Sequence, residues 1–284
     1  MKIAFLGTGK LGTELARHLL RDHDLTVWNR TLERTKPLRD EGATCAATPA
    51  EAVAGAEVVV SCLFGPDAVR ETIIAPQLIP DGMPWLDATT VSPADGEEFA
   101  RAVPSYVATP VVGSLGPARA GKLGVYVGGT DPQARKLAAE IVTPWADADR
   151  LIVVTDAAEA AVAKLLANLA LAVSAQGLTE ALTLGRARGL DDARVLDLLA
   201  HTGLAFIAGM KRNFVLGEAD VRDAHFAVDA IAKDARLMLS TSDRDLPATR
   251  AALKSLEAAE TRGQGAFDFS VITLPPESTP DADM

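Results

Sequence analysis

The chain has 284 residues, 48% of them hydrophobic, and a formal net charge of −10. This length and apolar content predict a sizeable core, most simply shared between two domains. The acidic excess argues against nucleic-acid binding through bulk charge, and the four histidines lack the spacing of a metal site. We expect no signal peptide, because the sequence lacks a charged n-region and a small-residue cleavage site, and no membrane span, because the longest apolar stretch contains charged and amide side chains. We therefore expect a cytoplasmic protein.

Short apolar runs alternate with helical patterns through the first half of the chain. Apolar runs without polar alternation are typical of parallel strands that are covered on both faces. The α/β alternation predicts a doubly wound, mainly parallel sheet with helices on both faces. Helix starts, each with a capping residue followed by proline, occur at Thr48, Ser92 and Asp131. We expect strands at residues 3–7, 25–29, 57–64, 85–90, 106–112, 124–129 and 151–155, and helices at 11–21 and 31–41.

The character of the sequence changes near residue 156, where we place a domain boundary. We expect a Rossmann-type domain over residues 1–156, an all-helical domain over 157–274 and a mobile, Pro- and Asp-rich tail over 275–284. Residues 157–188 form one long helical pattern that is apolar on most of its circumference. Such a helix has to be buried in a domain core or against a second subunit. We therefore expect a homodimer.

A GxGxxG loop, GTGKLG, links the first expected strand to the first expected helix, and its glycines are Gly7, Gly9 and Gly12. In a βαβ unit the first glycine permits a tight turn, the second lets the backbone approach a pyrophosphate, and the third lets the helix pack close to the strand. The helix N-terminus then faces the phosphates. We interpret the loop as a dinucleotide cradle. The alternative is a plain glycine-rich turn in an α/β domain that binds no cofactor.

The end of the second expected strand bears on which dinucleotide binds. The residue that contacts the ribose 2′ position lies about 20 residues after the glycines, and here it is Asn29, followed by Arg30 and Thr31. A carboxylate at this point would repel a 2′-phosphate, whereas an amide, a guanidinium and a hydroxyl are able to donate to one. The pattern predicts NADP, with NADPH preferred over NADH. The alternative is that Arg30 is a surface arginine beside a turn.

Lys164 and Asn168 stand four residues apart in the long apolar segment AAVAKLLANLALA. This spacing places both on one face of a helix, among Ala, Leu and Val residues. Burying an unpaired lysine is costly and lowers its pKa, so that the ammonium becomes a competent proton donor near neutral pH. The residues alone leave a second interpretation open, in which the lysine snorkels to the surface and Asn168 is a satisfied core amide.

In chain order, several motifs resemble those of the β-hydroxyacid dehydrogenases, the group that contains 3-hydroxyisobutyrate dehydrogenase and the glyoxylate and succinic semialdehyde reductases. GTGKLG resembles the cofactor loop of the family, and NRT resembles the version found in members that use NADPH. LDATTVSP resembles its DxSTxSP-like segment, KLLAN its catalytic KxxxN, and AKDARL its late KD segment. The resemblance spans nearly the whole chain. It implies an NADP-dependent dehydrogenase or reductase that acts on a small carbonyl or β-hydroxy-acid substrate.

The resemblance also implies roles for individual residues. Lys164 is the expected general acid or base, with Asn168 as its neighbour. Thr90 takes the position that meets the nicotinamide half of the cofactor, and Lys233 borders both substrate and cofactor. The full set of expected cofactor-binding residues is Gly7, Thr8, Gly9, Lys10, Leu11, Gly12, Asn29, Arg30, Thr31, Leu63, Phe64, Thr90, Lys233 and Asp234.

One motif departs from the family. The substrate loop of the family usually reads DAPVSGG, and here Val112 replaces the serine while Ser114 replaces the second glycine. Valine cannot orient a substrate by hydrogen bonding, but backbone N–H groups around Gly113 and the Ser114 hydroxyl are able to do so. We expect Val112, Gly113 and Ser114 to bind the substrate, together with Lys233. ATPVVG also resembles imine reductases, which usually carry Asp or Tyr at the position of Lys164. Two alternatives stay open: an imine reductase and a non-catalytic dinucleotide-binding module.

Overall fold

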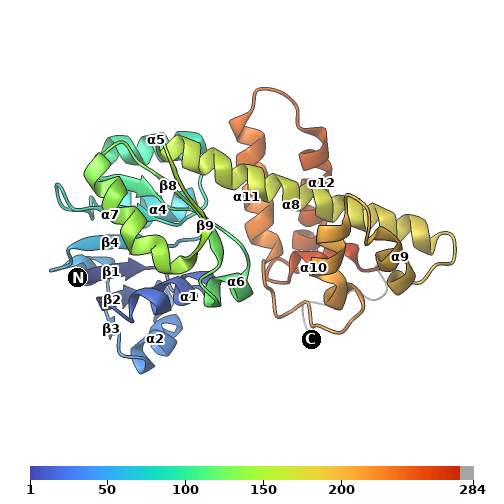
Figure 1. Cartoon of the computed structure of the whole chain (residues 1–284), viewed down its shortest axis with the longest axis horizontal. Coiled ribbons are helices and arrows are strands. Elements are labelled where there is room, and N and C mark those ends of the chain that lie inside the picture. Colours follow the sequence, from blue (N-terminus) through green and yellow to red (C-terminus); the bar gives the residue numbers. More distant parts are fainter. Residues whose placement is uncertain (276–284) are drawn as a thin grey trace. The chain divides into compact units, whose positions relative to one another are not determined.

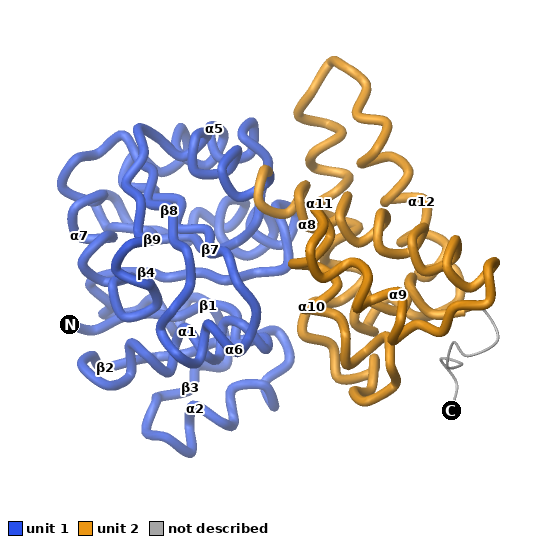
Figure 2. The backbone as a smooth tube through the Cα atoms, turned by 45° about the vertical axis from the view of Figure 1, so that its right-hand side comes forward, with its two compact units in different colours: residues 1–165 blue, residues 166–284 orange. Residues whose placement is uncertain are grey.

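The computed structural model describes residues 1–275, and residues 276–284 of the expected tail lie outside the described part. The chain consists of two compact units, Met1–Leu165 and Leu166–Met284 (Figure 2). The first unit contains the whole sheet, and the second is built from helices. The helix α8, Ala157–Arg186, begins in the first unit and ends in the second.

A nine-stranded sheet forms the centre of the first unit, in the order β3-β2-β1-β4-β5-β6-β8-β7, with β9 paired to β8 (Figure 1). The first six strands in this order, β3-β2-β1-β4-β5-β6, pair in parallel. Strand β8 runs antiparallel to β6 and β7, and β9 runs parallel to β8. The parallel part has the strand order of a Rossmann fold, whose ligand-binding switch point lies at the carboxyl ends of β1 and β4. The strands are β1 Lys2–Leu6, β2 Asp24–Trp28, β3 Thr44–Cys45, β4 Val58–Ser61, β5 Trp85–Asp87, β6 Tyr106–Ala108, β7 Val111–Val112, β8 Leu123–Gly128 and β9 Ala146–Val154.

Alternate residues of the central strands enter two separate cores, one on each face of the sheet. Ile3 and Phe5 of β1 belong to one apolar cluster, whereas Ala4 and Leu6 belong to the other. All four side chains are at most 1% exposed. Both faces of the sheet are therefore covered, as expected for strands without polar alternation. The predicted doubly wound, mainly parallel sheet is confirmed.

Three helices of the first unit begin directly after their predicted capping residues, Thr48, Ser92 and Asp131. Each of these side chains accepts a hydrogen bond from a backbone N–H of the first turn. Residues 31–41, predicted as one helix, instead form a 3₁₀ turn followed by a short α-helix, because Pro37 has no N–H to donate to the preceding turn. The helical segments are α1 Lys10–Leu19, the 3₁₀ turn Leu32–Thr35, α2 Lys36–Asp40, α3 Pro49–Val53, α4 Pro66–Val69, the π-helical turn Arg70–Ile74, α5 Pro93–Ala102, α6 Leu115–Arg119, α7 Pro132–Val142 and the 3₁₀ turn Thr143–Trp145.

The second unit packs its helices around one apolar core. Leu178 and Leu182 of α8, Ile231 of α11 and Leu256 of α12 all belong to this cluster and are at most 1% exposed. The predicted all-helical second half of the fold is confirmed. Its helices after α8 are α9 Asp192–Leu199, α10 Ala205–Val215, α11 Val228–Thr241, α12 Pro247–Thr261 and the 3₁₀ turn Phe269–Thr273.

The long helix α8 has 30 residues and ends at Arg186 rather than Arg188. Its burial within the single chain is incomplete, because Leu166 is 61% and Leu184 is 70% exposed. The single chain therefore buries only part of the apolar surface of this helix. Its length and apolar composition also satisfy a simple criterion for a membrane span, one that the core helices of soluble proteins satisfy as well.

Candidate functional site

The glycine loop turns the chain from β1 into α1. Gly7 has a φ of +103°, and a Cβ there would come within 2.3 Å of the carbonyl oxygen of Cys62. A Cβ on Gly12 would lie 2.0 Å from the carbonyl oxygen of Gly7. These two positions therefore require glycine for the turn and for close packing of α1 against the strand ends. Gly9, the N-cap of α1, is different, because a Cβ there would meet nothing within 4 Å.

The open space at Gly9 is where the sequence predicts the approach of a pyrophosphate. A glycine that no neighbouring atom requires fits a loop that leaves room for a ligand at the N-terminus of α1. Thr8, beside it, is 2% exposed, and its buried Oγ1 has no hydrogen-bond partner among residues 1–275. Lys10 is exposed and Leu11 is half-buried on the first turn of the helix. The loop therefore has the shape and the polar groups to hold a dinucleotide.

Asn29 joins the end of β2 to the glycine loop. Its Oδ1 accepts a hydrogen bond from the backbone N–H of Thr8 (3.1 Å), and its Nδ2 donates to the carbonyl oxygen of Thr31 (2.9 Å). The amide therefore uses both of its ends within the chain. Arg30 and Thr31 are exposed at the same strand end. Asn29 therefore fixes the end of β2 relative to the glycine loop, and the exposed Arg30 and Thr31 follow it directly.

The loops that follow β4 and β5 are also joined. The backbone N–H of Leu63 donates to the Thr89 hydroxyl (2.9 Å), and the backbone N–H of Thr89 donates to Oδ1 of Asp87 (3.1 Å). Phe64 is 60% exposed, and Thr90 is half-buried. Of the predicted cofactor residues, Leu63, Phe64 and Thr90 thus come from two neighbouring strand ends that are held together by hydrogen bonds.

Asp87 was not among the residues predicted from the sequence, although it ends a buried strand. Its carboxylate is 0% exposed, and it accepts hydrogen bonds from the Ser61 hydroxyl (2.7 Å) and, at 3.4 Å, from the Tyr106 hydroxyl. Burial raises the pKa of Asp87 to about 6, and the hydrogen bonds from Thr89, Ser61 and Tyr106 limit that rise. A carboxylate directly after an apolar run was the signal that sequence reasoning passed over.

The predicted substrate loop lies between β7 and α6. Val112 pairs with Gly124 across the β7–β8 ladder and is half-buried, and Gly113 is exposed with a φ of +147°. Ser114 is the N-cap residue of α6, but its side chain makes no capping hydrogen bond. The loop therefore presents a backbone in a glycine-only conformation and a hydroxyl that the helix does not use.

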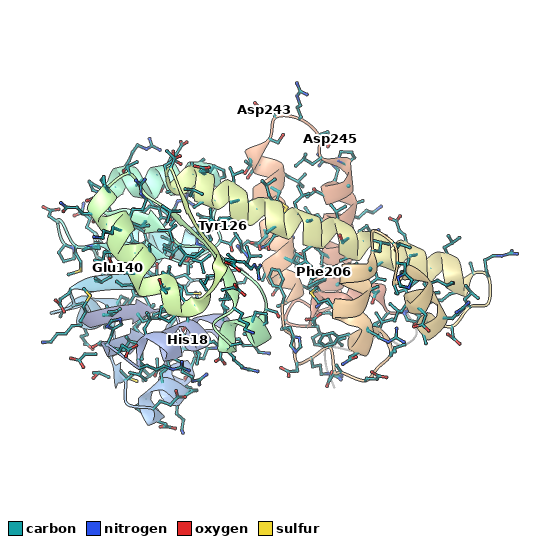
Figure 3. All side chains as sticks on the ribbon, in the orientation of Figure 1. His18, Tyr126, Glu140, Phe206, Asp243 and Asp245 are labelled. Atoms are coloured by element: carbon teal, nitrogen blue, oxygen red, sulfur yellow. The ribbon has the colours of Figure 1, made fainter. Side chains whose placement is uncertain are left out.

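The helix that follows this loop is fastened to α1. Nε2 of His18, a residue labelled in Figure 3, donates to the carbonyl oxygen of Ala118 (2.7 Å), and Arg119 pairs with Glu14 (3.1 Å). Glu14 is itself only 8% exposed and also pairs with Arg17 (2.5 Å). Because α1 begins at the glycine loop, these contacts connect the predicted substrate loop with the predicted cofactor loop.

Lys164 lies on α8 one turn after Ala160 and Ala161, which belong to the same buried apolar cluster as Leu6 at the end of β1. Burial raises the pKa of the Cys62 thiol to about 12, the carboxylate of Asp87 raises it further, and the charge of Lys164 lowers it. Cys62 is the residue whose carbonyl oxygen Gly7 packs against. The start of α8 is held in place by Gly128, where a Cβ would come within 2.0 Å of the carbonyl oxygen of Asp156.

In the second unit, α8 and α11 bring together three predicted residues. Nδ2 of Asn168 donates to Oδ2 of Asp234 (2.6 Å), and Nζ of Lys233 pairs with Oδ1 of the same carboxylate (2.5 Å). Asn168 is 4% and Asp234 is 2% exposed, whereas Lys233 is half-buried. The predicted site residues therefore form two groups. One surrounds the strand ends of the first unit, the other joins α8 to α11, and Lys164 and Asn168 stand one helical turn apart on α8.

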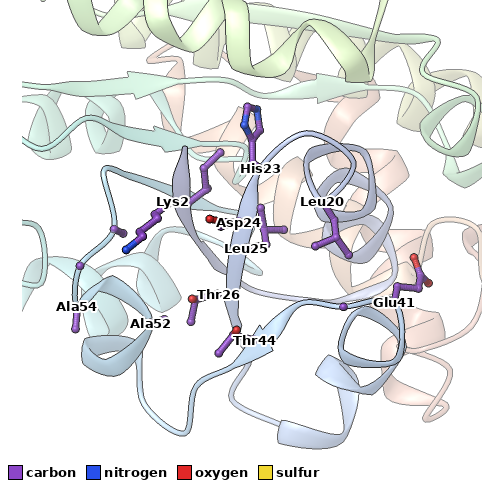
Figure 4. Close-up of a pocket in the computed structure, with 14 residues that line it drawn as sticks. Lys2, Leu20, His23, Asp24, Leu25, Thr26, Glu41, Thr44, Ala52 and Ala54 are labelled. Atoms are coloured by element: carbon purple, nitrogen blue, oxygen red, sulfur yellow. The ribbon is translucent and has the colours of Figure 1, made fainter.

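A separate hollow of about 570 Å³ lies at the opposite, amino-terminal edge of the sheet (Figure 4). It is lined by Lys2, Asp24 and Thr44, at the starts of β1, β2 and β3, among others. Ligands of open parallel sheets bind at the carboxyl ends of the strands, and all the predicted site residues lie elsewhere in the described chain. Among residues 1–275, no three His, Cys, Asp or Glu side chains are grouped so as to hold a metal ion.

Two family models match the chain. Residues 2–153 match the family model described as the NAD binding domain of 6-phosphogluconate dehydrogenase, and residues 158–274 match the model described as NAD-binding of NADP-dependent 3-hydroxyisobutyrate dehydrogenase. An oxidoreductase of Shewanella frigidimarina, itself uncharacterized, is 28% identical, with 86% of each chain covered. The cytokine-like nuclear factor N-PAC of Xenopus tropicalis is 27% identical over 95% of this chain, which spans 52% of that longer protein.

Solved structures share the fold of the whole chain. The 3-hydroxyisobutyrate dehydrogenase of Mycobacterium tuberculosis superposes with a TM-score of 0.80 at 22% identity, with 96% of this chain and 97% of that chain covered. A reductive aminase of Aspergillus terreus superposes with a TM-score of 0.63 at 21% identity, with 95% and 97% covered. The two family models together span nearly all of the described residues. The chain therefore belongs to the β-hydroxyacid dehydrogenase family and is an NAD(P)-binding oxidoreductase of the 3-hydroxyisobutyrate dehydrogenase type.

Proposed function

We propose that the protein transfers hydride between NADPH and a small carbonyl or β-hydroxy-acid substrate, with Lys164 as the general acid or base. One observation carries this proposal: Ala160 and Ala161, one turn before Lys164 on α8, are buried in the same apolar cluster as Leu6, which ends β1 directly before the glycine loop. A proton donor next to a dinucleotide cradle is the pair of components that carbonyl reduction requires.

The strand ends of the first unit supply the cofactor contacts in this proposal. When bound, the nicotinamide ring supplies or accepts the hydride. The exposed Arg30 and Thr31 favour the 2′-phosphorylated cofactor, because a guanidinium and a hydroxyl both donate to phosphate oxygens. We assign Leu63, Phe64 and Thr90 to the nicotinamide half. The Aspergillus terreus reductive aminase of the same fold was solved with NADPH, which also favours this choice.

The proton is held by Lys164. In reduction, Nζ of Lys164 donates a proton to the substrate oxygen that becomes the hydroxyl, and in oxidation it takes a proton from that hydroxyl. Asn168 assists by orientation. Because Asp234 only accepts hydrogen bonds when ionised, the amide of Asn168 must turn its Nδ2 toward Asp234 and its Oδ1 away from it. That oxygen is then aimed to accept from an ammonium or from a substrate hydroxyl.

The substrate loop supports an acidic substrate in spite of Val112. Backbone N–H groups near the exposed Gly113 and the hydroxyl of Ser114, which does not cap α6, are suited to a carboxylate. Lys233 adds a cation in the second group of residues, although its ammonium is paired with Asp234. The proposed substrate class is therefore a small aldehyde acid or the corresponding hydroxy acid.

Imine reduction is the second candidate, because Val112 takes the place of a hydrogen-bonding serine and lies half-buried in the loop. A valine there makes the pocket wall less polar and suits a substrate without a carboxylate. The reductive aminase fold is compatible with this candidate. Lys164 argues against it, since an imine reductase usually carries Asp or Tyr at that position.

The test is NADPH consumption, with NADH as the control cofactor, against glyoxylate, succinic semialdehyde, methylmalonate semialdehyde and a cyclic imine. Turnover of an aldehyde acid with NADPH supports the dehydrogenase proposal. Turnover of the imine alone replaces it with the second candidate. Binding of NADPH without turnover of any of the four compounds contradicts both and leaves the non-catalytic module.

We also propose that the protein is a homodimer. Leu166 and Leu184 are exposed on the apolar helix α8, and a second copy would remove them from water. Light scattering at micromolar concentration measures the mass directly. A dimer mass agrees with the proposal, and a monomer mass contradicts it.

A further inference from the structure

We propose that Asp87 and Thr89 form a positioning relay, which sets the loop after β4 against the loop after β5 and so shapes the contact with the nicotinamide half of the cofactor. The inference rests on the proposed function, because Leu63, Phe64 and Thr90 are assigned there to that half. Neither Asp87 nor Thr89 is itself assigned a contact with cofactor or substrate.

The relay is a continuous line of hydrogen bonds between two loops. Oδ1 of Asp87 accepts from the backbone N–H of Thr89 (3.1 Å), and the Thr89 hydroxyl accepts from the backbone N–H of Leu63 (2.9 Å). Thr89 therefore serves both partners, donating to Asp87 through its backbone N–H and accepting from Leu63 through its hydroxyl oxygen.

The carboxylate at the root of the relay is held rigidly. Asp87 is 0% and Thr89 is 3% exposed. The Ser61 hydroxyl donates to the same oxygen of Asp87 (2.7 Å), and Nε1 of Trp85 in turn donates to the Ser61 hydroxyl (2.8 Å). Hydrogen bonds from Trp85 to Ser61 and from Ser61 to Asp87 therefore connect the side chains of β4 and β5 with the loops that follow these strands.

The stability of the fold does not explain why a carboxylate is buried at position 87. Burial raises its pKa to about 6, so the ionised form is less favoured in the folded protein than in water. The groups that face it are the Ser61, Thr89 and Tyr106 hydroxyls and the Cys62 thiol, with Lys164 acting on that thiol and Asp95 acting on Tyr106. A buried charge that is costly to keep, placed directly beneath two cofactor loops, points to a role in the site.

Thr89 gives the sharper variant, because valine has nearly the same shape. Thr89→Val leaves the backbone N–H of Leu63 without its acceptor and keeps the packing of the β5 loop. Thr89→Ser restores the hydroxyl. Val142→Ala is the matched control for a general loss of stability, since Val142 is 0% exposed in the core of the same unit but lies on α7, outside the relay.

The measurement compares two ligands by calorimetric titration: NADP⁺, and adenosine 2′,5′-bisphosphate, which has no nicotinamide. In Thr89→Val we expect the Kd of NADP⁺ to rise about tenfold, the scale of losing a supporting hydrogen bond around a site, while the Kd of the bisphosphate stays within about twofold. Thr89→Ser should return the Kd of NADP⁺ to within about threefold of the wild-type value. Val142→Ala should not raise the Kd of one ligand more than the Kd of the other.

Each contrary result has its own meaning. Equal weakening of both ligands in Thr89→Val would reduce the relay to a purely structural role and overturn the inference. Unchanged affinity for NADP⁺ would overturn it as well. A different result would be that the wild-type protein binds NADP⁺ no more tightly than the bisphosphate. In that case the nicotinamide half contributes nothing to binding, and the proposed function itself fails.

Discussion

Asn168 on α8 donates a hydrogen bond to Asp234 on α11 across 2.6 Å, and both side chains are almost completely buried. Since Asp234 also pairs with Lys233, the carboxylate holds an amide and an ammonium at once. A buried amide with a fixed partner cannot rotate to exchange its oxygen and nitrogen. Asp234 thus fixes the orientation of Asn168, one helical turn from Lys164.

Asn168→Asp places a second carboxylate opposite Asp234, so we expect the free energy of unfolding to fall by about 2 kcal/mol or more at pH 7.5. The loss should shrink near pH 5, because two close carboxylates share a proton and the pKa of the pair rises. Urea unfolding at the two pH values measures it. Asn168→Ala, which removes the bond without adding a charge, should show no such recovery, and equal pH dependence in the two variants would refute the explanation.

Cofactor preference tests the role of Arg30. Arg30→Ala should raise the KM for NADPH on the order of tenfold or more and leave the KM for NADH nearly unchanged, because only NADPH carries the phosphate that the guanidinium pairs with. Arg34→Ala is a matched control, because Arg34 is exposed and its substitution removes the same charge four residues further along the chain. A similar rise in Arg34→Ala would mean that the general field, not a specific contact, favours NADPH.

Asn29→Asp separates the two bonds of that side chain. The carboxylate can still accept from the backbone N–H of Thr8 but cannot donate to the carbonyl oxygen of Thr31, and its charge repels a 2′-phosphate. We expect the ratio of kcat/KM for NADPH over NADH to fall by about tenfold or more. The ratio is measured with one substrate and both cofactors. An unchanged ratio would show that this strand end does not contact the 2′ position.

Asp87 makes a prediction about stability and pH. Because burial raises its pKa from 3.8 to about 6, folding takes up a proton between these values, and stability should increase as the pH falls from about 7 to about 4. A difference of about two pKa units corresponds to on the order of 3 kcal/mol. Other groups titrate in the same range, so the informative quantity is the difference between the wild-type protein and Asp87→Asn in urea unfolding. Parallel curves for the two proteins would contradict the raised pKa.

The sequence was sufficient for those parts of the fold that depend on local pattern. The caps at Ser92 and Asp131 bind N–H groups two or three residues away, and the apolar runs of β1 and β4 reveal their own burial. The division of residues 31–41 into two helical segments was missed, although Pro37 was visible, because a proline near a helix start is compatible with either outcome.

The candidate site could be predicted only as a set of residues. The bond between Asn29 and Thr8 spans 21 positions, and that between Asn168 and Asp234 spans 66, so neither partner can be deduced from local pattern. The sequence predicts Asn29 as a cofactor contact, and the structure adds that its amide also bonds to the backbone of Thr8 and Thr31. Asp87 was passed over because a carboxylate at a strand end acquires meaning only when its neighbours in the sheet are known.

The most direct test of the account is Lys164→Ala, assayed with NADPH and the best aldehyde acid, with the Kd of NADPH measured separately by fluorescence. The account predicts that kcat falls on the order of 10²-fold or more, the usual share of general acid–base catalysis, while the Kd of NADPH stays within about twofold. Lys254→Ala, at an exposed lysine on α12, should leave both quantities unchanged. An unchanged kcat in Lys164→Ala with normal NADPH binding would contradict the account and remove Lys164 from the mechanism.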